Sequence, residues 1–373
     1  MRKTRVIVPT VYHADCPTVR SRLFLWSEML VNKSFEFTFL ILGDGIKEVC
    51  PGITYWGYKN YLDLIRIVLN LRKEDYDIIL SCKPYSISGV LPYLMSRIRR
   101  MGYLLDVDDR IFPSEINKWW RLPLYVQEWC AERLMMWMKP LTVVASRALK
   151  DYWGDHVEYV PNTVKLSAFS RHMVSSNAIK ENFGIHGPVV VWPAVFFQEI
   201  DRTYVLEIFD FIQKMRKGIA LLVLGSGDYL ASVKATAHQL RLSNVHFGGA
   251  VDHGQMPSLY ASADAGILPL RNNHYDACKG PIKLYEYMAM ELPVIATPIG
   301  EPREMVEKAH CGILIPFDNP AKAAMNIIEL LESGERLKQL GRNGRAYLEH
   351  HQSLQAQAER IENMLLMTQN QMR

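Results

Sequence analysis

The sequence contains no run of about 18 uncharged apolar residues, no CxxC pair and no repeat of 20–50 residues. Without such an apolar run, we expect no helix that crosses a membrane. The apolar stretch at 5–10 is too short for a signal-peptide core, so we expect a first strand there rather than a secretory leader. The six cysteines are scattered and have no histidine at metal-ligand spacing. This pattern argues against a disulfide framework and a zinc site, and it favours a reducing cytoplasm.

Net charge is also small, formally +4 over 373 residues, and it is unevenly spread. Residues 1–165 carry 23 Lys and Arg against 18 Asp and Glu, whereas the remaining residues carry 20 against 21. A basic first half suits an anionic acceptor or a membrane surface, and it is equally typical of a solvated surface. We expect no nucleic-acid partner.

Apolar runs alternate with helical patterns along the whole chain, which predicts βαβ units and parallel sheets. The length is too great for one core and suits two domains of about 150–200 residues each. We therefore predict an α/β fold of two doubly wound, Rossmann-like domains. The predicted parts are a first domain at 1–165, a Ser-rich linker at 166–187, a second domain at 188–350 and a C-terminal helix at 351–373 that returns to the first domain.

The apolar patterns place the individual elements. In the first domain, strands are predicted at 5–10, 37–42, 77–81, 102–107, 141–146 and 157–161, with helices at 20–31, 61–72, 89–100, 114–138 and 146–153. In the second, strands are predicted at 189–194, 220–227, 245–249, 265–270, 293–298 and 312–317, with helices that include 202–216, 228–241, 255–262, 281–291 and 320–333. Ligands of such sheets bind beyond the carboxyl ends of the strands, so we expect a ligand cleft lined by loops of both domains.

The segment 278–300, CKGPIKLYEYMAMELPVIATPIG, carries the clearest chemistry. Gly280 and Pro281 favour a helix start, where exposed N–H groups and the helix dipole suit a phosphate. Lys279 and Lys283 add positive charge at the same end, and Glu286 follows Lys283 by three residues on one helix face. A carboxylate there can accept hydrogen bonds from both ribose hydroxyls. The simpler interpretation is a surface helix with one Lys–Glu pair.

Several stretches of the second half together resemble the family 4 retaining glycosyltransferases, which have two domains of the GT-B type. These stretches are 221–233, 244–270, 283–306 and 311–331, in the same order and at the same spacing. In the first half, LTVVASRALKDYWGDHVEYVPNTV at 141–164 resembles the family's last strand, helix and entry to the linker, although Asn162 and Thr163 replace the usual Asn-Gly.

The resemblance implies a role for individual residues. Glu286 would bind the ribose of a nucleotide-diphosphate sugar, and Gly280, Pro281 and Ile282 would present backbone N–H groups to its pyrophosphate. The nucleobase would lie at residues that include Gly248, Gly249 and Val251. Further expected contacts come from the Gly-x-Gly turn, from the loop after the 293–298 strand and from an arginine near the first strand: Gly225, Gly227, Thr297, Gly300 and Arg20. Arg22 is a candidate for the same kind of phosphate contact as Arg20.

The chain also departs from the family's pattern. Members commonly carry a second glutamate eight residues before the ribose glutamate, where this chain has Cys278. A Gly-Arg…Lys pair after the first strand of the second domain is absent from 192–202, so Lys279 and Lys283 are expected to neutralise the leaving diphosphate without a metal. A histidine common after the fourth strand is replaced by Asp106-Val107-Asp108-Asp109.

That acidic element permits a rival interpretation. In single-domain GT-A transferases, an Asp-x-Asp after a strand binds the divalent metal that carries the nucleotide diphosphate. Asp106 and Asp108 have this spacing, but GT-A would leave the phosphate site of the second half unexplained. We therefore expect Asp106 and Asp108 to line the cleft and bind acceptor or sugar hydroxyls, unless they are solvated carboxylates at a strand end.

Aromatic and basic residues are interleaved through 97–140, for instance Arg97, Trp129, Arg133, Trp137 and Lys139. This mixture suits a peripheral contact with a membrane surface that presents a lipid-linked acceptor, and it is also typical of a core helix with one wet face.

The resulting hypothesis is a retaining, metal-independent glycosyltransferase with a nucleotide-sugar donor and a glycan or lipid-linked acceptor, active in cell-surface polysaccharide or glycan assembly. Two alternatives stay open. One is an epimerase or phosphorylase of the same fold, and the other is a catalytically silent partner protein in a transferase complex.

Overall fold

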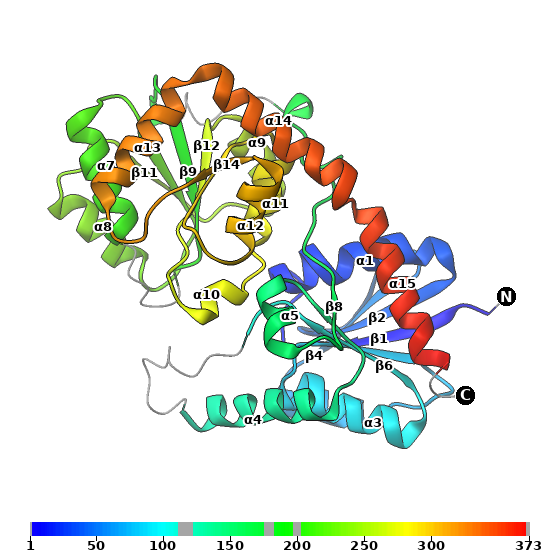
Figure 1. Cartoon of the computed structure of the whole chain (residues 1–373). Helices are drawn as coiled ribbons and strands as arrows, with labels where there is room; N and C mark the ends of the chain where they lie inside the picture. The colour runs from blue at the N-terminus through cyan, green and yellow to red at the C-terminus, as the bar shows by residue number, and fades with distance from the viewer. Residues whose placement is uncertain (1, 111–121, 175–182, 197–202, 371–373) are drawn as a thin grey trace. The chain divides into compact units, whose positions relative to one another are not determined.

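The computed structural model describes residues 2–110, 122–174, 183–196 and 203–370, and the chain divides into two compact units (Figure 1). The first unit comprises Met1–Thr163, Cys278–Gly280 and Gln352–Arg373, and the second comprises Val164–Ala277 and Pro281–His351. The short segment Cys278–Gly280 therefore belongs to the first unit, although the sequence places it within the predicted second domain. The described part of the predicted linker after Val164 belongs to the second unit.

The first unit is built on an eight-stranded sheet in the order β3-β4-β2-β1-β5-β6-β7-β8. All neighbours are parallel except β3 and β4. The strands are β1 (Thr4–Pro9), β2 (Phe35–Leu42), β3 (Ile46–Cys50), β4 (Ile53–Tyr58), β5 (Ile78–Cys82), β6 (Gly102–Val107), β7 (Thr142–Val144) and β8 (Glu158–Tyr159).

Central strands of this sheet are buried along their whole length, as in β5 and β6, because helices cover both faces of a parallel sheet. The helices are α1 (Phe24–Leu30), α2 (Tyr61–Leu69), α3 (Leu91–Arg99), α4 (Leu122–Met138), α5 (Arg147–Trp153) and α15 (Leu354–Asn370). The C-terminal helix α15 lies beside α1 on this unit (Figure 1). There Ile361 and Leu365 are buried in the same cluster as Trp26 and Leu30.

The second unit has a six-stranded, all-parallel sheet in the order β11-β10-β9-β12-β13-β14. Its strands are β9 (Val189–Pro193), β10 (Ala220–Leu224), β11 (Val245–Gly249), β12 (Ala265–Leu268), β13 (Val294–Ala296) and β14 (Gly312–Leu314). The helices packed around it are α7 (Thr203–Met215), α8 (Leu230–Gln239), α9 (Met256–Ala261), α10 (His274–Cys278), α11 (Ile282–Ala289), α12 (Gly300–Ala309), α13 (Pro320–Glu332) and α14 (Gly334–His351).

Local details differ from the predicted elements. The strands β3 and β4 were not predicted. Strand β3 is an exposed, antiparallel edge without an apolar alternation, and β4 beside it is mostly half-buried. The strand predicted at 220–227 ends at Leu224, before the Gly-x-Gly turn. The helix predicted at 281–291 is α11, and Pro281 is its N-cap in an extended conformation rather than a member of its first turn. Among the described residues, no helix has the length and apolar character that crossing a bilayer requires.

Candidate functional site

The carboxyl ends of the strands in the second unit gather most of the predicted donor-binding residues. Gly225 and Gly227 follow β10, Gly249 ends β11, and Thr297 follows β13. The chain leaves β12 at the same edge and reaches the start of α11. In parallel sheets this edge is where ligands bind, since helix N-termini and loops converge there.

Glu286 is the best-defined polar group of the second unit. It lies in α11 and is 3% exposed, so its carboxylate requires partners. Tyr260 in α9 donates its hydroxyl to Oε2 at 2.7 Å, and His253 Nε2 lies 2.8 Å from Oε1. Burial, aided by the charge of Glu286, holds the pKa of Tyr260 well above 10, so the phenol stays a donor. Each carboxylate oxygen has a further lone pair, so the group can accept additional hydrogen bonds.

His253 and Tyr260 were missed by the sequence analysis, although both lie in the stretch that resembles the family. His253 begins a 3-10 turn (His253–Gln255) whose N-cap Asp252 accepts from the Gly254 N–H at 2.7 Å. Its side chain is 29% exposed, which makes it the accessible member of the trio. A polar residue in the loop after an expected strand was the only local signal for it.

The amino terminus of α11 has no side-chain cap. Its first backbone N–H groups therefore have no internal helical partner, which is the usual basis of an anion site at a helix start. Ile282 and Lys283 are the first two residues of the helix and are half-buried. Gly280 and Lys279 just before it belong to the first unit, where Asn162 donates its amide to the Gly280 carbonyl at 2.6 Å.

The two glycines after β10 have a steric reason to be glycine. Gly225 has a φ of +128°, and a Cβ there would lie 1.8 Å from the Ala194 carbonyl oxygen. Gly227 has a φ of +141°, and its Cβ would meet the backbone of Phe196 at 2.3 Å. The turn therefore packs directly on the chain that leaves β9, which is a structural role for both residues.

The other residues of this unit that were predicted to contact the donor differ in how closely their surroundings pack. Gly249 adopts a φ of +70° with open space around its Cβ position, and Gly248 packs against Leu224. The neighbouring Val251 packs against the core. Gly300 has a φ of +55°, and a Cβ there would lie 2.5 Å from the Ala277 carbonyl oxygen.

Thr297 is a correction to the predicted sugar pocket. Its side chain is 2% exposed, and its hydroxyl donates to the Leu270 carbonyl at 2.6 Å. The hydroxyl is thus used to join the loops after β12 and β13, and it is not presented to a ligand.

In the first unit, the carboxyl ends of the strands carry buried ion pairs instead. Asp106 at the end of β6 is 1% exposed and accepts bidentate hydrogen bonds from Arg22, at 2.8–3.0 Å. Arg22 also donates to the Val160 carbonyl and to Asn162, and its guanidinium lies 4.2 Å from the ring centroid of Trp26. The predictions that Asp106 binds a substrate and Arg22 a phosphate are therefore wrong, because each is enclosed and saturated by the other.

A second cluster lies beside this pair, around Lys83. Its ammonium contacts both Asp108 and Asp109, and Thr18 donates its hydroxyl to Asp108. Burial would raise the pKa of Asp108, but the Lys83 charge and these hydrogen bonds outweigh it and hold that pKa below its ordinary value. Burial raises the pKa of Asp109, although the charges of Lys83 and Lys279 oppose the shift.

Lys83 was also missed by the sequence analysis. It adopts a φ of +70°, unusual for a residue with a side chain, directly after β5. Within the described ranges, no group of three or more His, Cys, Asp or Glu side chains could hold a metal ion. The alternative Asp-x-Asp metal site has no support, because an ammonium group lies against Asp108 and a guanidinium against Asp106.

Cys278 takes the place of the glutamate that family members commonly have. It is buried with core residues of the first unit, and its carbonyl accepts from the Ser146 hydroxyl at 2.7 Å. Burial raises the pKa of its thiol to about 11. Arg20 is half-buried and donates to the Asp15 carbonyl at 3.1 Å.

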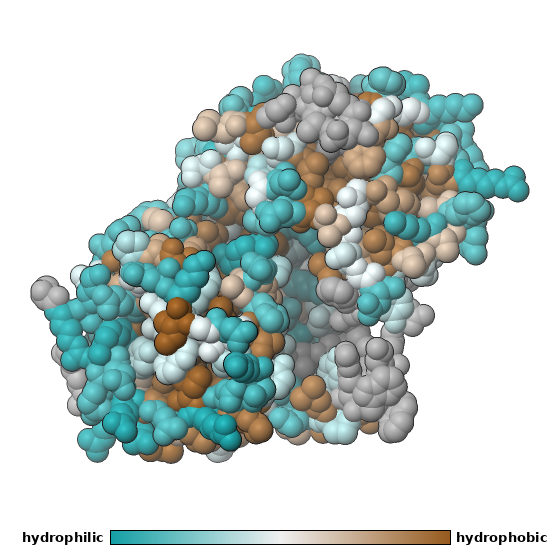
Figure 2. Space-filling model, turned by 180° about the vertical axis from the view of Figure 1, so that it is seen from behind, coloured by the Kyte–Doolittle hydropathy of each residue, from teal (hydrophilic) through white to brown (hydrophobic). Residues whose placement is uncertain are grey.

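The segment predicted to contact a membrane includes α3 and α4 of the first unit. Exposed apolar side chains on these helices are Leu94, Ile98, Leu122, Leu124, Val126, Trp129, Leu134 and Trp137. Figure 2 shows hydrophobic residues, in brown, gathered among hydrophilic ones along its lower edge. The predicted aromatic and basic residues at 111–121 lie outside the described residues.

Comparisons with known proteins bear on the family and on the fold. The sequence profile of the family described as "Glycosyl transferases group 1" matches residues 177–347. The chain is 26% identical over 226 residues to the GDP-mannose-dependent monoacylated alpha-(1-6)-phosphatidylinositol monomannoside mannosyltransferase of Corynebacterium glutamicum, a match that covers 59% of each protein. The chain spans about half to three-fifths of the length of such curated relatives.

Solved structures are similar over almost the whole chain. WaaG, a glycosyltransferase involved in lipopolysaccharide biosynthesis, superposes with a TM-score of 0.73 at 14% identity, covering 96% of this chain and 99% of that one. Anabaena HepE in complex with UDP-glucose superposes with a TM-score of 0.74 at 14% identity, covering 97% and 99%. At such identities the likeness shows the fold, and the predicted GT-B fold of two Rossmann-like sheets is confirmed.

Proposed function

We propose that this chain, which belongs to the glycosyl transferases group 1 family, transfers a sugar from a nucleotide-diphosphate donor to a glycan or lipid-linked acceptor. The reaction is proposed to retain the anomeric configuration. Cell-surface polysaccharide or glycan assembly is the proposed setting, since relatives act on a phosphatidylinositol mannoside and in lipopolysaccharide biosynthesis.

The observation that carries this proposal is the oriented carboxylate of Glu286 in α11. The hydrogen bonds to Tyr260 and His253 fix both of its oxygens before any ligand arrives, so no rearrangement of the carboxylate is needed to meet a ribose diol. The accessible His253 ring lies on the same carboxylate and would contact the ribose as well.

The diphosphate would lie at the uncapped start of α11. Backbone N–H groups at Ile282 and Lys283, together with the Lys283 ammonium, would stabilise the negative charge that develops on the leaving nucleotide diphosphate. In this scheme the acceptor hydroxyl attacks on the face from which the diphosphate departs.

Replacing Glu286 tests the ribose contact directly. Glu286→Gln removes the charge and keeps the shape, so binding of GDP-mannose or UDP-glucose, measured by calorimetry, should weaken about 10- to 100-fold for whichever donor the wild type binds. Glu335→Gln, at an exposed glutamate of the same unit, is the matched control. Equal donor affinity in the two variants would remove Glu286 from the site.

Replacing Lys283 tests the leaving-group role. Lys283→Ala should lower turnover about 100-fold, measured as release of nucleoside diphosphate, while exposed Lys322→Ala should not. A wild-type protein that binds a donor but releases no diphosphate with any acceptor mixture would favour the silent-partner alternative. Loss of turnover in a chelator would contradict the proposed metal-free chemistry.

A membrane-surface contact through α3 and α4 is part of the proposal. Exposed apolar side chains stand beside Arg97, Arg99, Arg100 and Arg133 there, which suits a lipid-linked acceptor at an anionic surface. Co-sedimentation with vesicles of phosphatidylcholine and phosphatidylglycerol checks it, and Ile98→Ser combined with Trp137→Ser should reduce binding. Unchanged sedimentation of this double variant would exclude the contact.

A further inference from the structure

A three-residue turn of the first unit comes from a distant part of the sequence. The segment Cys278–Gly280 belongs to this unit, although its chain neighbours on both sides belong to the second. The next residue, Pro281, is the N-cap of α11. Cys278 is buried in the core cluster that includes Val144 and Leu149. The turn that leads into the proposed diphosphate site is therefore built on the framework of the first unit.

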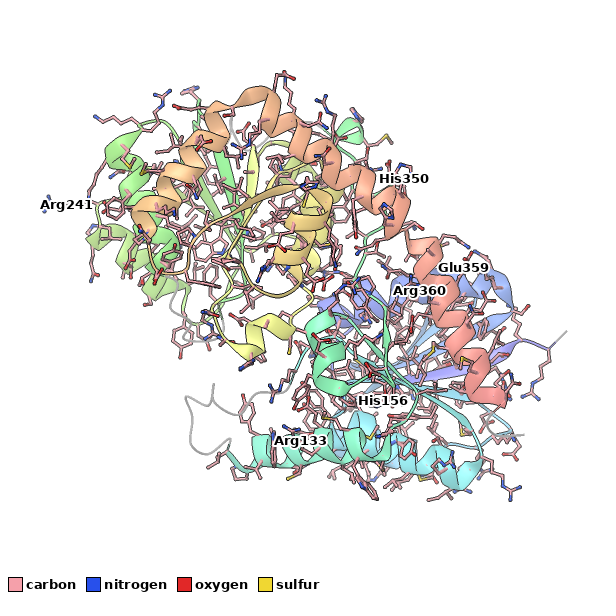
Figure 3. The ribbon with its side chains drawn as sticks, in the orientation of Figure 1. Arg133, His156, Arg241, His350, Glu359 and Arg360 are labelled. Atoms are coloured by element: carbon pink, nitrogen blue, oxygen red, sulfur yellow. The ribbon has the colours of Figure 1, made fainter. Side chains whose placement is uncertain are left out.

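A serine holds the first residue of this turn. Ser146 is fully buried, and its hydroxyl donates to the Cys278 carbonyl at 2.7 Å. The same oxygen accepts from the Leu149 N–H at 3.2 Å, because Ser146 is the N-cap of α5. Figure 3 labels His156 on the loop after α5, at the end of this helix that is away from Ser146. The helix cap thus fixes the oxygen, and the hydroxyl hydrogen is directed to the carbonyl.

An asparagine holds the last residue of the turn. Asn162 Nδ2 donates to the Gly280 carbonyl at 2.6 Å, and its Oδ1 accepts from Arg22 at 3.0 Å. A guanidinium can only donate, so the amide oxygen faces Arg22 and the amide nitrogen is directed at Gly280. Arg22 is itself fixed by its bidentate hydrogen bonds to Asp106. A line of buried polar groups therefore runs from the end of β6 to the turn.

Close packing also restricts the turn. A Cβ on Gly280 would lie 3.1 Å from the carbonyl oxygen of Ala145, directly after β7, so only glycine lets the turn approach this closely. The ring of Pro281 fixes the next φ. In a trans peptide the N–H points away from the carbonyl, so the bond to the Cys278 carbonyl also sets the direction of the Lys279 N–H.

The direction of this turn bears on the proposed chemistry. Lys279 lies in the turn, and Lys283 follows in the first turn of α11. Donors that already point to the place where charge develops stabilise a leaving diphosphate without a cost of reorganisation. A misplacement of about 1 Å lowers a rate by up to about 100-fold, even when the change lies away from the reacting atoms. Residues that only hold the turn therefore affect the rate.

We propose that Ser146 and Asn162 are positioning residues for the diphosphate end of the donor site. They act by holding the carbonyls of Cys278 and Gly280, so that the turn before α11 keeps the orientation in which it receives the diphosphate. The inference rests on the proposed function, because without a diphosphate site the turn would have nothing to orient. It also accounts for a cysteine at position 278, which anchors the turn in a core instead of presenting a carboxylate to a sugar.

The test replaces the two side chains that hold the turn. Ser146→Ala removes the hydroxyl, and Asn162→Asp keeps an acceptor for the guanidinium but sets a carboxylate oxygen against the Gly280 carbonyl. Both should lower turnover, measured as release of nucleoside diphosphate, about tenfold, which is the effect of one hydrogen bond on the developing charge. The two variants differ in their other partners, since only Ser146 caps α5, so a shared effect isolates the turn.

Thr142→Val is the matched control. Its buried hydroxyl also donates to a backbone carbonyl, that of Pro140 at 2.9 Å, but at the beginning of β7 rather than at its end. This variant should unfold at a lower urea concentration, as Ser146→Ala does, while its turnover stays at the wild-type value. A Thr142→Val variant that loses turnover in the same proportion as Ser146→Ala would overturn the positioning role, because the loss would then follow stability alone.

Binding of nucleotides without the sugar gives a second readout. Calorimetry with UMP and UDP, or with GMP and GDP, should show that the wild type binds the diphosphate more tightly than the monophosphate. Both variants should reduce this ratio about tenfold, with a smaller effect on the monophosphate. Folded variants that keep the wild-type ratio and turnover would overturn the inference alone. A wild type without any preference for the diphosphate would contradict the proposed function, and the inference with it.

Discussion

The carboxyl ends of the two parallel sheets differ in the groups that they carry. In the first unit they hold buried charges in close pairs, Arg22 with Asp106 and Lys83 with Asp108 and Asp109. In the second they hold glycine turns, an uncapped helix start and one oriented carboxylate, Glu286. The first edge satisfies its own charges, whereas the second brings together glycine turns, a helix start and a carboxylate. The buried pairs therefore stabilise the first unit, and the second edge is the one at which we propose donor binding.

The largest effect is expected where a buried charge would lose its partner. Arg22→Met leaves the Asp106 carboxylate enclosed and unpaired, which should lower the free energy of unfolding of the first unit by about 3–5 kcal/mol. Urea unfolding, with hydrogen exchange followed by mass spectrometry to locate the loss in the first unit, measures this. The double variant Arg22→Met, Asp106→Leu removes both charges and should recover most of the stability. If Arg22→Met alone is as stable as the wild type, the ion pair does not stabilise the first unit.

A backbone clash should give the next effect, in the second unit. Gly225→Ala places a methyl group against the Ala194 carbonyl in a φ that side chains avoid, and should cost about 2–4 kcal/mol. Gly218→Ala, with a φ of +95° and open space, isolates the conformational part and should cost about 1 kcal/mol. Thermal unfolding of the two variants gives the difference. Equal losses would mean that the turn does not pack on the chain after β9.

The fold was predictable from local pattern because its signals are short-range. The strand predicted at 102–107 is β6, and the strand predicted at 189–194 is β9, since buried strands are largely apolar runs bounded by turns. The Gly-x-Gly turn and the start of α11 were also predictable from the sequence, because glycine and proline have strong local preferences. Strand β3 was not predictable, because an exposed edge strand has no apolar pattern.

The candidate site was only partly predictable, because its partners are far apart in the chain. Glu286 was identified, but its hydrogen bonds come from residues 26 and 33 positions away, Tyr260 and His253. Asp106 and Asp108 were correctly placed at the end of a strand, but they were expected to bind acceptor or sugar hydroxyls, whereas in the structure they pair with Arg22 and Lys83. No local spacing shows that Arg22 lies 84 positions earlier against Asp106. Whether a carboxylate is free or paired is decided by tertiary contacts.

Replacing Lys83 tests whether the second charge cluster stabilises the first unit as much as the Arg22–Asp106 pair does. Its partners are more exposed than Asp106, so Lys83→Met should cost less than Arg22→Met, about 2 kcal/mol. In the wild type, the lowered pKa of Asp108 gives stability that is present above its unfolded value and is lost as pH falls through the folded value. The variant should raise the pKa of Asp108, measured by carboxyl carbon NMR. An unchanged pKa would show that Lys83 is not its main partner.

The smallest effect is expected for Thr297. Its replacement tests whether the hydroxyl stabilises the fold or contacts the donor. Thr297→Val keeps the shape but leaves the Leu270 carbonyl without its donor, so we expect a loss of about 1 kcal/mol in unfolding free energy. Donor affinity should stay at the wild-type value, because the hydroxyl is enclosed between the loops after β12 and β13. Calorimetric titration with the donor, beside thermal unfolding, separates the two roles. If donor affinity falls while the unfolding temperature is unchanged, the Thr297 hydroxyl contacts the donor, and the donor site includes the loop after β13.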